Sequence, residues 1–112
     1  MKVLIVERNL IWTARLSKAV AASGHEGVVV SGIGEELPAT DLAIVNLSDP
    51  ALRPFECVEK LRSAGVPVLG HAGHKEKELW EKGRDAGCDR IVSNGEITFK
   101  LPEILKEFAH AG

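Results

Sequence analysis

Short apolar runs alternate along the chain with longer stretches in which apolar residues recur at helical spacing. Val3-Leu-Ile-Val6 is the first such run, and a short run of β-branched and leucine side chains predicts a buried strand. Between Asn9 and Ser23 the apolar positions lie four, three and one residues apart, which is one face of a helix, and Gly24 is placed to end it. The residues on that face are Trp12, Leu16, Ala19 and Val20.

The same alternation continues to the end of the chain. Further strands are expected at 28–30, 41–47, 67–70 and 90–93. Further helices are expected before Gly65, before Gly87 and from Leu101 to Phe108, with Pro102 tolerated in the first turn of the last one. Alternating strands and helices favour right-handed crossovers and a parallel sheet covered on both faces. The prediction is one α/β domain over residues 1–112, with a doubly wound, five-stranded parallel sheet.

The connection between Ser31 and Asp41 is too short for this scheme. It is punctuated by Gly32, Gly34 and Pro38, whereas a full crossover with its helix needs roughly 10–12 residues or more. We therefore expect the second helix to be shortened or missing, and the sheet face beside it to be thinly covered. The uncovered surface is a candidate contact region formed by Val28 to Val30, Ile33 and Leu37.

Composition and charge exclude several classes of protein. The chain is 45% hydrophobic and 27% charged, as is ordinary for a soluble domain, and its 14 basic and 16 acidic residues are interspersed. This balance indicates neither a nucleic-acid nor a membrane partner, and no apolar run approaches the roughly 18 residues of a membrane span. We expect a cytoplasmic protein. Cys57 and Cys88 lie in apolar patterns without metal-ligand spacing, so buried free thiols are predicted.

Four segments, taken together, resemble the receiver domain of two-component response regulators, and the resemblance covers nearly the whole chain. They are Val3-Leu-Ile-Val-Glu-Arg8, Asp41-Leu-Ala-Ile-Val-Asn-Leu-Ser-Asp-Pro50, Val66-Pro-Val-Leu69 and Asp85-Ala-Gly-Cys-Asp-Arg-Ile-Val92. The resemblance implies a flavodoxin-like fold with the strand order 2-1-3-4-5 and a role in signal transduction.

In a working receiver, the resemblance implies five polar positions at the carboxyl edge of the sheet. Two acids follow the first strand, and one of them coordinates Mg²⁺. A phosphorylated Asp ends the third strand, a Ser or Thr follows the fourth and a Lys follows the fifth. In this chain the corresponding residues are Glu7, Arg8, Asn46, Ala72 and Asn94. Three carboxylates and one Lys in the family pattern thus become one carboxylate and one Arg, so the pocket loses its net negative charge.

These replacements predict a degenerate pocket. Asn46 offers no anionic oxygen to a phosphoryl group, and Mg²⁺ requires anionic oxygen ligands. We expect Asn46 to be a buried amide hydrogen-bonded to neighbouring loops, with Arg8 as a candidate partner. Arg8 itself is either a solvated loop residue or a fixed cation that pairs with Glu7 in place of the metal.

The functional prediction is a phosphorylation-independent pseudo-receiver that acts as a protein-interaction module, without enzymatic activity and without a cofactor or metal. The expected partner is a signalling protein or a second copy of the chain. The resemblance places the contact face on the fourth helix, fifth strand and fifth helix of a receiver. On this chain that face contains Trp80, Arg84, Arg90, Ile91 and Lys106.

Two alternatives stay open at this point. One is a small flavodoxin-like metal or ligand binder, or an enzyme, that uses Glu7, Asp49, His71 and His74 at the same edge. The simpler interpretation of the two histidines is that His71 ends a strand and His74 starts the following helix. The other alternative is a receiver that accepts phosphate on Asp49.

Overall fold

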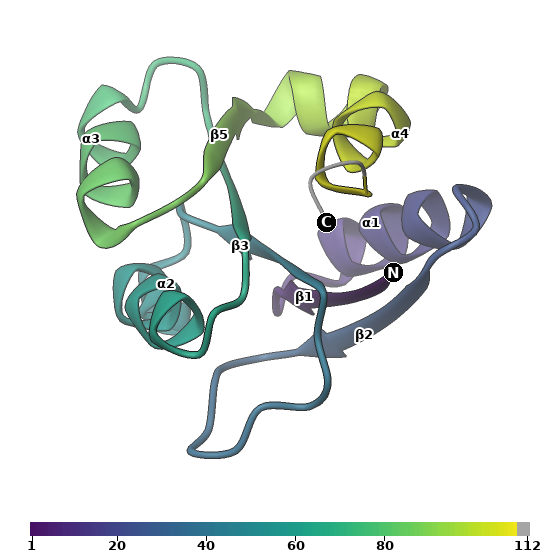
Figure 1. Cartoon of the computed structure of the whole chain (residues 1–112). Helices are drawn as coiled ribbons and strands as arrows, with labels where there is room; N and C mark the ends of the chain where they lie inside the picture. The colour runs from purple at the N-terminus through teal and green to yellow at the C-terminus, as the bar shows by residue number, and fades with distance from the viewer. Residues whose placement is uncertain (110–112) are drawn as a thin grey trace.

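The strands form one parallel sheet in the order β2-β1-β3-β4-β5, with helices on both faces (Figure 1). This computed structural model describes residues 1–109. The strands are β1 (Lys2–Val6), β2 (Glu26–Val30), β3 (Leu42–Asn46), β4 (Val68–Ala72) and β5 (Arg90–Ser93). The helices are α1 (Leu10–Ala22), α2 (Pro54–Ser63), α3 (Lys77–Ala86) and α4 (Asn94–Ala109), with a 3-10 turn η1 (Pro50–Leu52). The predicted fold class and strand order are confirmed.

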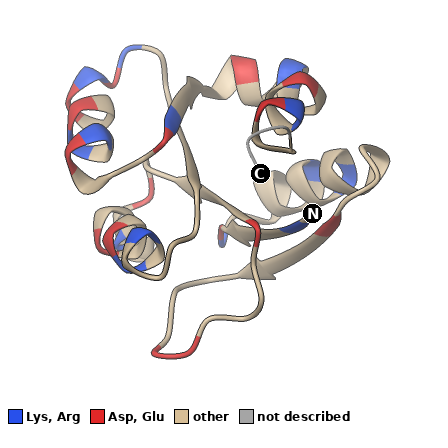
Figure 2. Ribbon diagram, viewed as in Figure 1, with Lys and Arg blue, Asp and Glu red and all other residues tan. Residues whose placement is uncertain are grey.

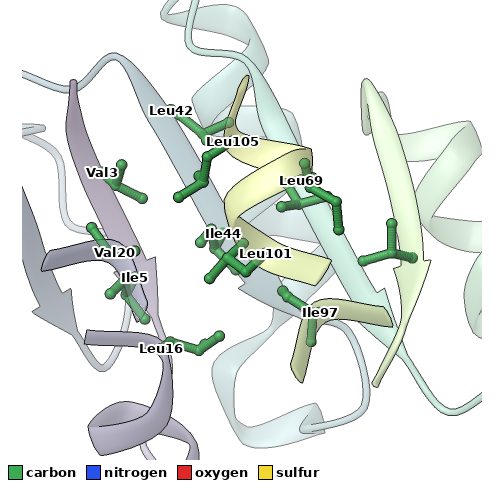
Figure 3. Packing of buried hydrophobic residues seen from close by; sticks show 12 residues of the cluster. Val3, Ile5, Leu16, Val20, Leu42, Ile44, Leu69, Ile97, Leu101 and Leu105 are labelled. Carbon is green, nitrogen blue, oxygen red and sulfur yellow. The ribbon is translucent and has the colours of Figure 1, made fainter. Parts of the chain in front are cut away.

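Side-chain alternation along the strands builds two cores, one on each face of the sheet. In β1, Val3 and Ile5 join the core beneath α1 and α4, whereas Leu4 and Val6 join the core beneath α2 and α3. Figure 3 shows the first of these cores, in which strand residues meet Leu101 and Leu105 of α4. Because both faces of the central strands are buried, these strands read in the sequence as continuous apolar runs rather than as alternating ones.

Two glycines let α3 lie close against the sheet. A Cβ atom on Gly70 of β4 would lie 2.9 Å from Leu47 Cδ1, and one on Gly83 of α3 would lie 2.8 Å from the same atom. Either contact is too short for real carbon atoms, so the two hydrogens make room for the Leu47 side chain between helix and strand. The loop after β3 is thereby held in place.

The second crossover contains no helix, as its length predicts. Residues 31–41 run as bends and irregular backbone between β2 and β3 (Figure 1), and the first four residues of β2 are exposed. Val28 is 41% exposed and Val29 is 40% exposed, although both are β-branched strand residues. β2 is therefore an edge strand that lacks the cover given to the other strands.

The last helix begins earlier than its apolar spacing predicts. Ser93 Oγ accepts a hydrogen bond from the Glu96 backbone N–H at 3.0 Å, and the Glu96 carboxylate accepts one from the Ser93 backbone N–H at 3.1 Å. This reciprocal capping box starts α4 directly after β5. The placement of Pro102 in the first turn was therefore wrong: it lies inside α4, with its side chain exposed.

No helix within residues 1–109 is both long enough and apolar enough to cross a membrane.

Candidate functional site

Parallel strands direct their carboxyl ends to one edge of the sheet, and the five predicted pocket positions follow or end strands at this edge. Glu7 and Arg8 follow β1, Asn46 ends β3, Ala72 ends β4, and Asn94 follows β5. Ligands of doubly wound sheets bind in the crevice at such an edge. The hydrogen bonds among these residues decide what this crevice can hold.

A buried hydrogen bond between Glu7 and Asn46 occupies the centre of the pocket. Glu7 is 1% exposed and Asn46 is 7% exposed, and Asn46 Nδ2 donates to Glu7 Oε2 at 2.8 Å. The other carboxylate oxygen, Oε1, accepts from the backbone N–H groups of Arg8 and Asn9 at 3.1 and 3.0 Å. Asn46 Oδ1 accepts from the Ser48 N–H at 2.9 Å. The predicted buried amide is confirmed, but its side-chain partner is Glu7 instead of Arg8.

Arg8 pairs across the pocket with Asp49, not with Glu7 as the sharper hypothesis proposed. Its Nε donates to Asp49 Oδ2 at 2.6 Å, and the two side chains are 55% and 18% exposed. This hydrogen bond from Arg8 lowers the pKa of Asp49, and the same bond raises the pKa of Arg8. The pair joins the loop after β1 to the loop after β3. Because Glu7 already has three donors, Arg8 is free to reach the more exposed acid.

His71 is fully buried under α1 and α4. Its ring centroid lies 4.9 Å from that of Trp12, and its Nδ1 donates to Asn94 Oδ1 at 2.9 Å. In the neutral ring this leaves Nε2 unprotonated, and no hydrogen-bond partner from residues 1–109 reaches that atom. Burial lowers the pKa of His71, while the Asn94 hydrogen bond and the charge of Glu7 oppose that effect. Asn94, which the resemblance matches to the family's Lys, thus forms a hydrogen bond with a buried side chain.

His74 does not start the next helix, contrary to the simpler interpretation of the sequence. It lies exposed on a turn, and α3 begins at Lys77. The residue that organises this turn is Glu76, whose Oε1 accepts from Gly73 N–H at 2.8 Å and from Ser48 Oγ at 2.7 Å. Sequence reasoning missed Glu76, because it lies in a charged run that is typical of a solvated helix start.

The residues at this edge do not fit a magnesium ion. Both Glu7 oxygens already accept hydrogen bonds, and the Asp49 oxygens accept from Arg8 and from the Ala51 N–H. Asn46 directs its amide nitrogen, a donor, at Glu7. Within residues 1–109 no three His, Cys, Asp or Glu side chains gather as metal ligands do. The set of Glu7, Asp49, His71 and His74 is therefore not brought together.

The predicted contact face is partly used by the fold's own packing. Arg84, Arg90 and Lys106 are exposed, and Arg90 forms an ion pair with Glu107 at 3.4 Å. Ile91 and Trp80 are half-buried against the core beneath α2 and α3, and the indole N–H of Trp80 donates to the Gly73 carbonyl at 3.0 Å. Trp80 is thus a packing residue at the rim.

Three exposed apolar side chains were not singled out from the sequence. Leu10 and Ile11 on α1 are 84% and 67% exposed, and Phe99 on α4 is 81% exposed. All three lie outside the buried apolar face of their helix. An apolar residue at such a position in the sequence indicates an exposed apolar side chain. Figure 2 shows acidic and basic residues on α2, α3 and α4, whereas α1 carries only the basic residues Arg15 and Lys18.

The two cysteines are free thiols, as predicted. Cys57 is buried, and its Sγ donates to the Leu52 carbonyl at 3.2 Å. Cys88 is half-buried beside α3. Burial raises the pKa of Cys57 and raises the pKa of Cys88 to about 12, so neither forms a thiolate readily.

Similar solved structures include proteins that are described as response regulators or receiver domains. A two-component response regulator from Clostridium difficile superposes with a TM-score of 0.84 at 14% identity, over 98% of this chain and 96% of that chain. A CheY-like response regulator receiver domain protein from Methanospirillum hungatei gives 0.77 at 20% identity, over 99% and 98%. The chain has the receiver-domain fold. No family model and no curated protein matches its sequence.

A third similar structure provides a contrast at the pocket. It is the receiver domain of a sensor histidine kinase from Pseudomonas aeruginosa, described with a magnesium ion coordinated in its active-site cleft. Its TM-score is 0.79 at 16% identity, over 97% of this chain and 94% of that chain. The receiver fold is thus shared with a protein that holds the metal, while the side chains of this chain satisfy one another at the same edge of the sheet.

The burial of His71 predicts that stability falls with acidity. Its pKa is lowered in the folded state, so the unfolded chain binds the extra proton more readily once the pH drops below about 6.5. The free energy of unfolding, measured with urea, should decrease from pH 7.5 to pH 5 by at most about 1.4 kcal/mol per pH unit from this group.

The variant His71→Asn keeps a donor for Asn94 but cannot titrate, so its pH slope should be shallower than that of the wild type. His74→Gln changes an exposed imidazole and should retain the wild-type slope. Equal slopes in the wild type and His71→Asn would contradict the assignment.

The hydrogen bond between Asn46 and Glu7 predicts that restoring an acid at position 46 destabilises the fold. Asn46→Asp places a second carboxylate 2.8 Å from Glu7 Oε2. Unfolding in urea at pH 7.5 should require about 3 kcal/mol less free energy, the scale of a buried charge without its partner. Two close carboxylates raise the pKa of the pair, so the loss should shrink as the pH falls and they share a proton.

Asn94→Asp makes the same chemical change at a side chain that accepts a hydrogen bond from His71. It should lower the free energy of unfolding far less than Asn46→Asp does. An Asn46→Asp protein as stable as the wild type at pH 7.5 would overturn this prediction.

Proposed function

We propose that this chain is a pseudo-receiver, a phosphorylation-independent module that regulates signalling through protein contacts. The observation that carries the proposal is the buried Asn46 amide, which donates to Glu7 at the position where the resemblance places the phosphoryl acceptor. An amide has no anionic oxygen for phosphoryl transfer. The receiver fold of the similar structures supports a regulatory role in the same class of pathway.

The loops that surround the pocket are tied to one another by side chains. Arg8 reaches Asp49, Ser48 reaches Glu76, and His71 reaches Asn94. These contacts join the loops after β1, β3 and β4 and the start of α4. A switch needs a ligand that binds two arrangements differently. With no phosphoryl group to make that difference, regulation depends on the partner's concentration or on ligand binding elsewhere.

Phosphorylation at Asp49 is the weaker alternative. Asp49 lies on the loop before η1, where one oxygen accepts from Arg8 Nε and the other from the Ala51 N–H. A phosphoryl acceptor needs a free carboxylate oxygen and a cation that balances the incoming charge. Arg8 supplies a positive charge, but its Nε donates to Asp49 Oδ2, an oxygen that would have to attack the phosphoryl group.

Intact-mass spectrometry can test this part of the proposal. After incubation with a small acyl phosphate and Mg²⁺, the wild-type chain should show no phosphoryl mass increment, because Asn46 cannot accept the group and both Asp49 oxygens are engaged. A receiver with an intact pocket, treated in parallel, provides the positive control. An increment that disappears in Asp49→Asn would support the alternative and remove the proposed independence from phosphorylation.

The contact face that we propose for a protein partner flanks β5. Its exposed charges are Arg84, Arg90 and Lys106, and the half-buried Trp80 and Ile91 contribute apolar surface at its rim. Arginine and tryptophan are enriched where interfaces gain most of their binding energy. The exposed ion pair between Arg90 and Glu107 adds little stability, so this arginine can turn to a partner at small cost.

Paired variants with the same loss of charge can test the face. Arg84→Ala with Arg90→Ala should weaken binding of the purified partner at least tenfold, equivalent to about 1.4 kcal/mol, in a titration by calorimetry. Arg15→Ala with Lys18→Ala removes two positive charges from α1 and should leave the affinity unchanged. The reverse outcome would move the contact to the α1 surface that carries Leu10 and Ile11.

A further inference from the structure

In the part of the chain that the structure describes, the outer edge of β2 presents unpaired backbone groups in a regular pattern. Glu26 N–H donates to the Met1 carbonyl, and Glu7 N–H donates to the Val30 carbonyl, both at 3.0 Å. With the parallel register of Lys2 to Glu26 and Val6 to Val30, the backbone groups of Glu26, Val28 and Val30 face β1. Those of Gly27 and Val29 therefore face outward, away from the sheet. Each presents one donor and one acceptor.

This pattern is complementary to itself. If a second β2 lies antiparallel, with a two-fold axis through Val28, Gly27 of each copy faces Val29 of the other. At each hydrogen-bonded position of an antiparallel ladder, the two opposed residues donate to and accept from each other. Gly27 and Val29 can form such a pair. All four outward donors of the two strands are then paired. The same residues thus meet one another on both copies, as a two-fold interface demands.

The side chains also fit the register in which Gly27 of one copy lies opposite Val29 of the other. A Cβ atom on Gly27 would lie 3.3 Å from Ile5 Cδ1 and 3.4 Å from Val20 Cγ1, so Gly27 faces α1 and has no side chain there. Val29 lies on this face of the sheet and is 40% exposed. In the pairing, each Val29 lies opposite the other copy's Gly27, where the missing side chain leaves space. The Val28 side chains of the two copies contact each other on the other face of the sheet, where the β2–β3 crossover contains no helix.

Charge and sequence do not oppose the pairing. Glu26, the acidic residue of β2, would lie opposite Val30 of the second copy, so the two glutamates are at opposite ends of the paired strands. Proteins that keep edge strands single place lysine, proline or a bulge there. β2 contains neither lysine nor proline and pairs with β1 in an uninterrupted register.

We propose that two copies of the chain associate through antiparallel pairing of their β2 strands, which joins two five-stranded sheets into one. The occupant of the uncovered edge is thus a second copy of this chain. The association uses the side of the sheet opposite to the β5 face. It does not depend on the chemistry of the Asn46 pocket, so either proposal can fail alone.

Sedimentation velocity over protein concentrations up to about 0.5 mM provides the test, because five residues a side make a weaker contact than the usual 20–30. The wild type should shift from the 12.1 kDa chain to twice that mass as concentration rises. Val29→Pro removes an outward N–H that β1 does not use and should sediment as a monomer. Val29→Thr keeps the donor and the shape and should still associate. Circular dichroism confirms that each variant is folded.

A cross-link determines the register. Opposed residues of a non-hydrogen-bonded antiparallel pair have Cα atoms about 4.5 Å apart, within disulfide range. Val28→Cys should therefore give a covalent dimer on mild oxidation. Glu26→Cys, two residues from the axis, should not, and neither should the wild type with Cys57 and Cys88. A wild type that stays monomeric at every concentration, or a dimer equally strong in Val29→Pro, would overturn the proposal.

Discussion

A buried carboxylate at the end of β1 organises the carboxyl edge of this protein. Glu7 is almost completely removed from water, and a buried charge is costly unless hydrogen bonds replace its hydration. Asn46 and the backbone N–H groups of Arg8 and Asn9 supply those bonds. Asn9 in turn accepts from the N–H groups of Ile11 and Trp12 and so begins α1. The position of Trp12 over His71 follows from that start.

The same hydrogen bonds explain how the loops around the pocket stay ordered without the set of charges that the family pattern has. In the family pattern, several carboxylates share an edge and need a metal ion to offset their repulsion. Here one carboxylate faces an amide donor, and the second acid, Asp49, faces a guanidinium. Neither arrangement requires a ligand. The sheet edge is therefore complete without the ion.

The crossover between β2 and β3 contains no helix, and it leaves β2 at an uncovered edge of the sheet. α1 and α4 cover one face, and α2 and α3 cover the other, but the α2 layer does not extend over β2 (Figure 1). On this uncovered face the β-branched side chain of Val28 is 41% exposed. Apolar side chains and unpaired backbone groups in the same strand favour further pairing. The short crossover thus changes which edge of the sheet is available to a partner.

Much of the fold could be predicted from the sequence because it depends on local patterns. The alternation of apolar runs and helical spacing defines the strands and α1, and the length of residues 31–41 excludes a full crossover helix. The sequence also shows that Arg8, Asn46, Ala72 and Asn94 bring no carboxylate to the carboxyl edge. These features need only residue type and spacing. The start of α4 is also local, but its Ser93–Glu96 capping box is easily taken for a turn.

Only the tertiary structure decided which side chains pair. The sequence suggested Glu7 and Asn46 as partners for Arg8, but Arg8 pairs with Asp49, because backbone and amide donors already satisfy Glu7. His71 lies near His74 in the chain, yet strand alternation turns it into the core beneath α1 while His74 stays in solvent. Contacts of this kind join residues 23 to 41 positions apart, so local spacing in the sequence does not predict them. The sequence by itself determined the scaffold and the residue types at the carboxyl edge of the sheet, and the three-dimensional packing determined how those residues pair.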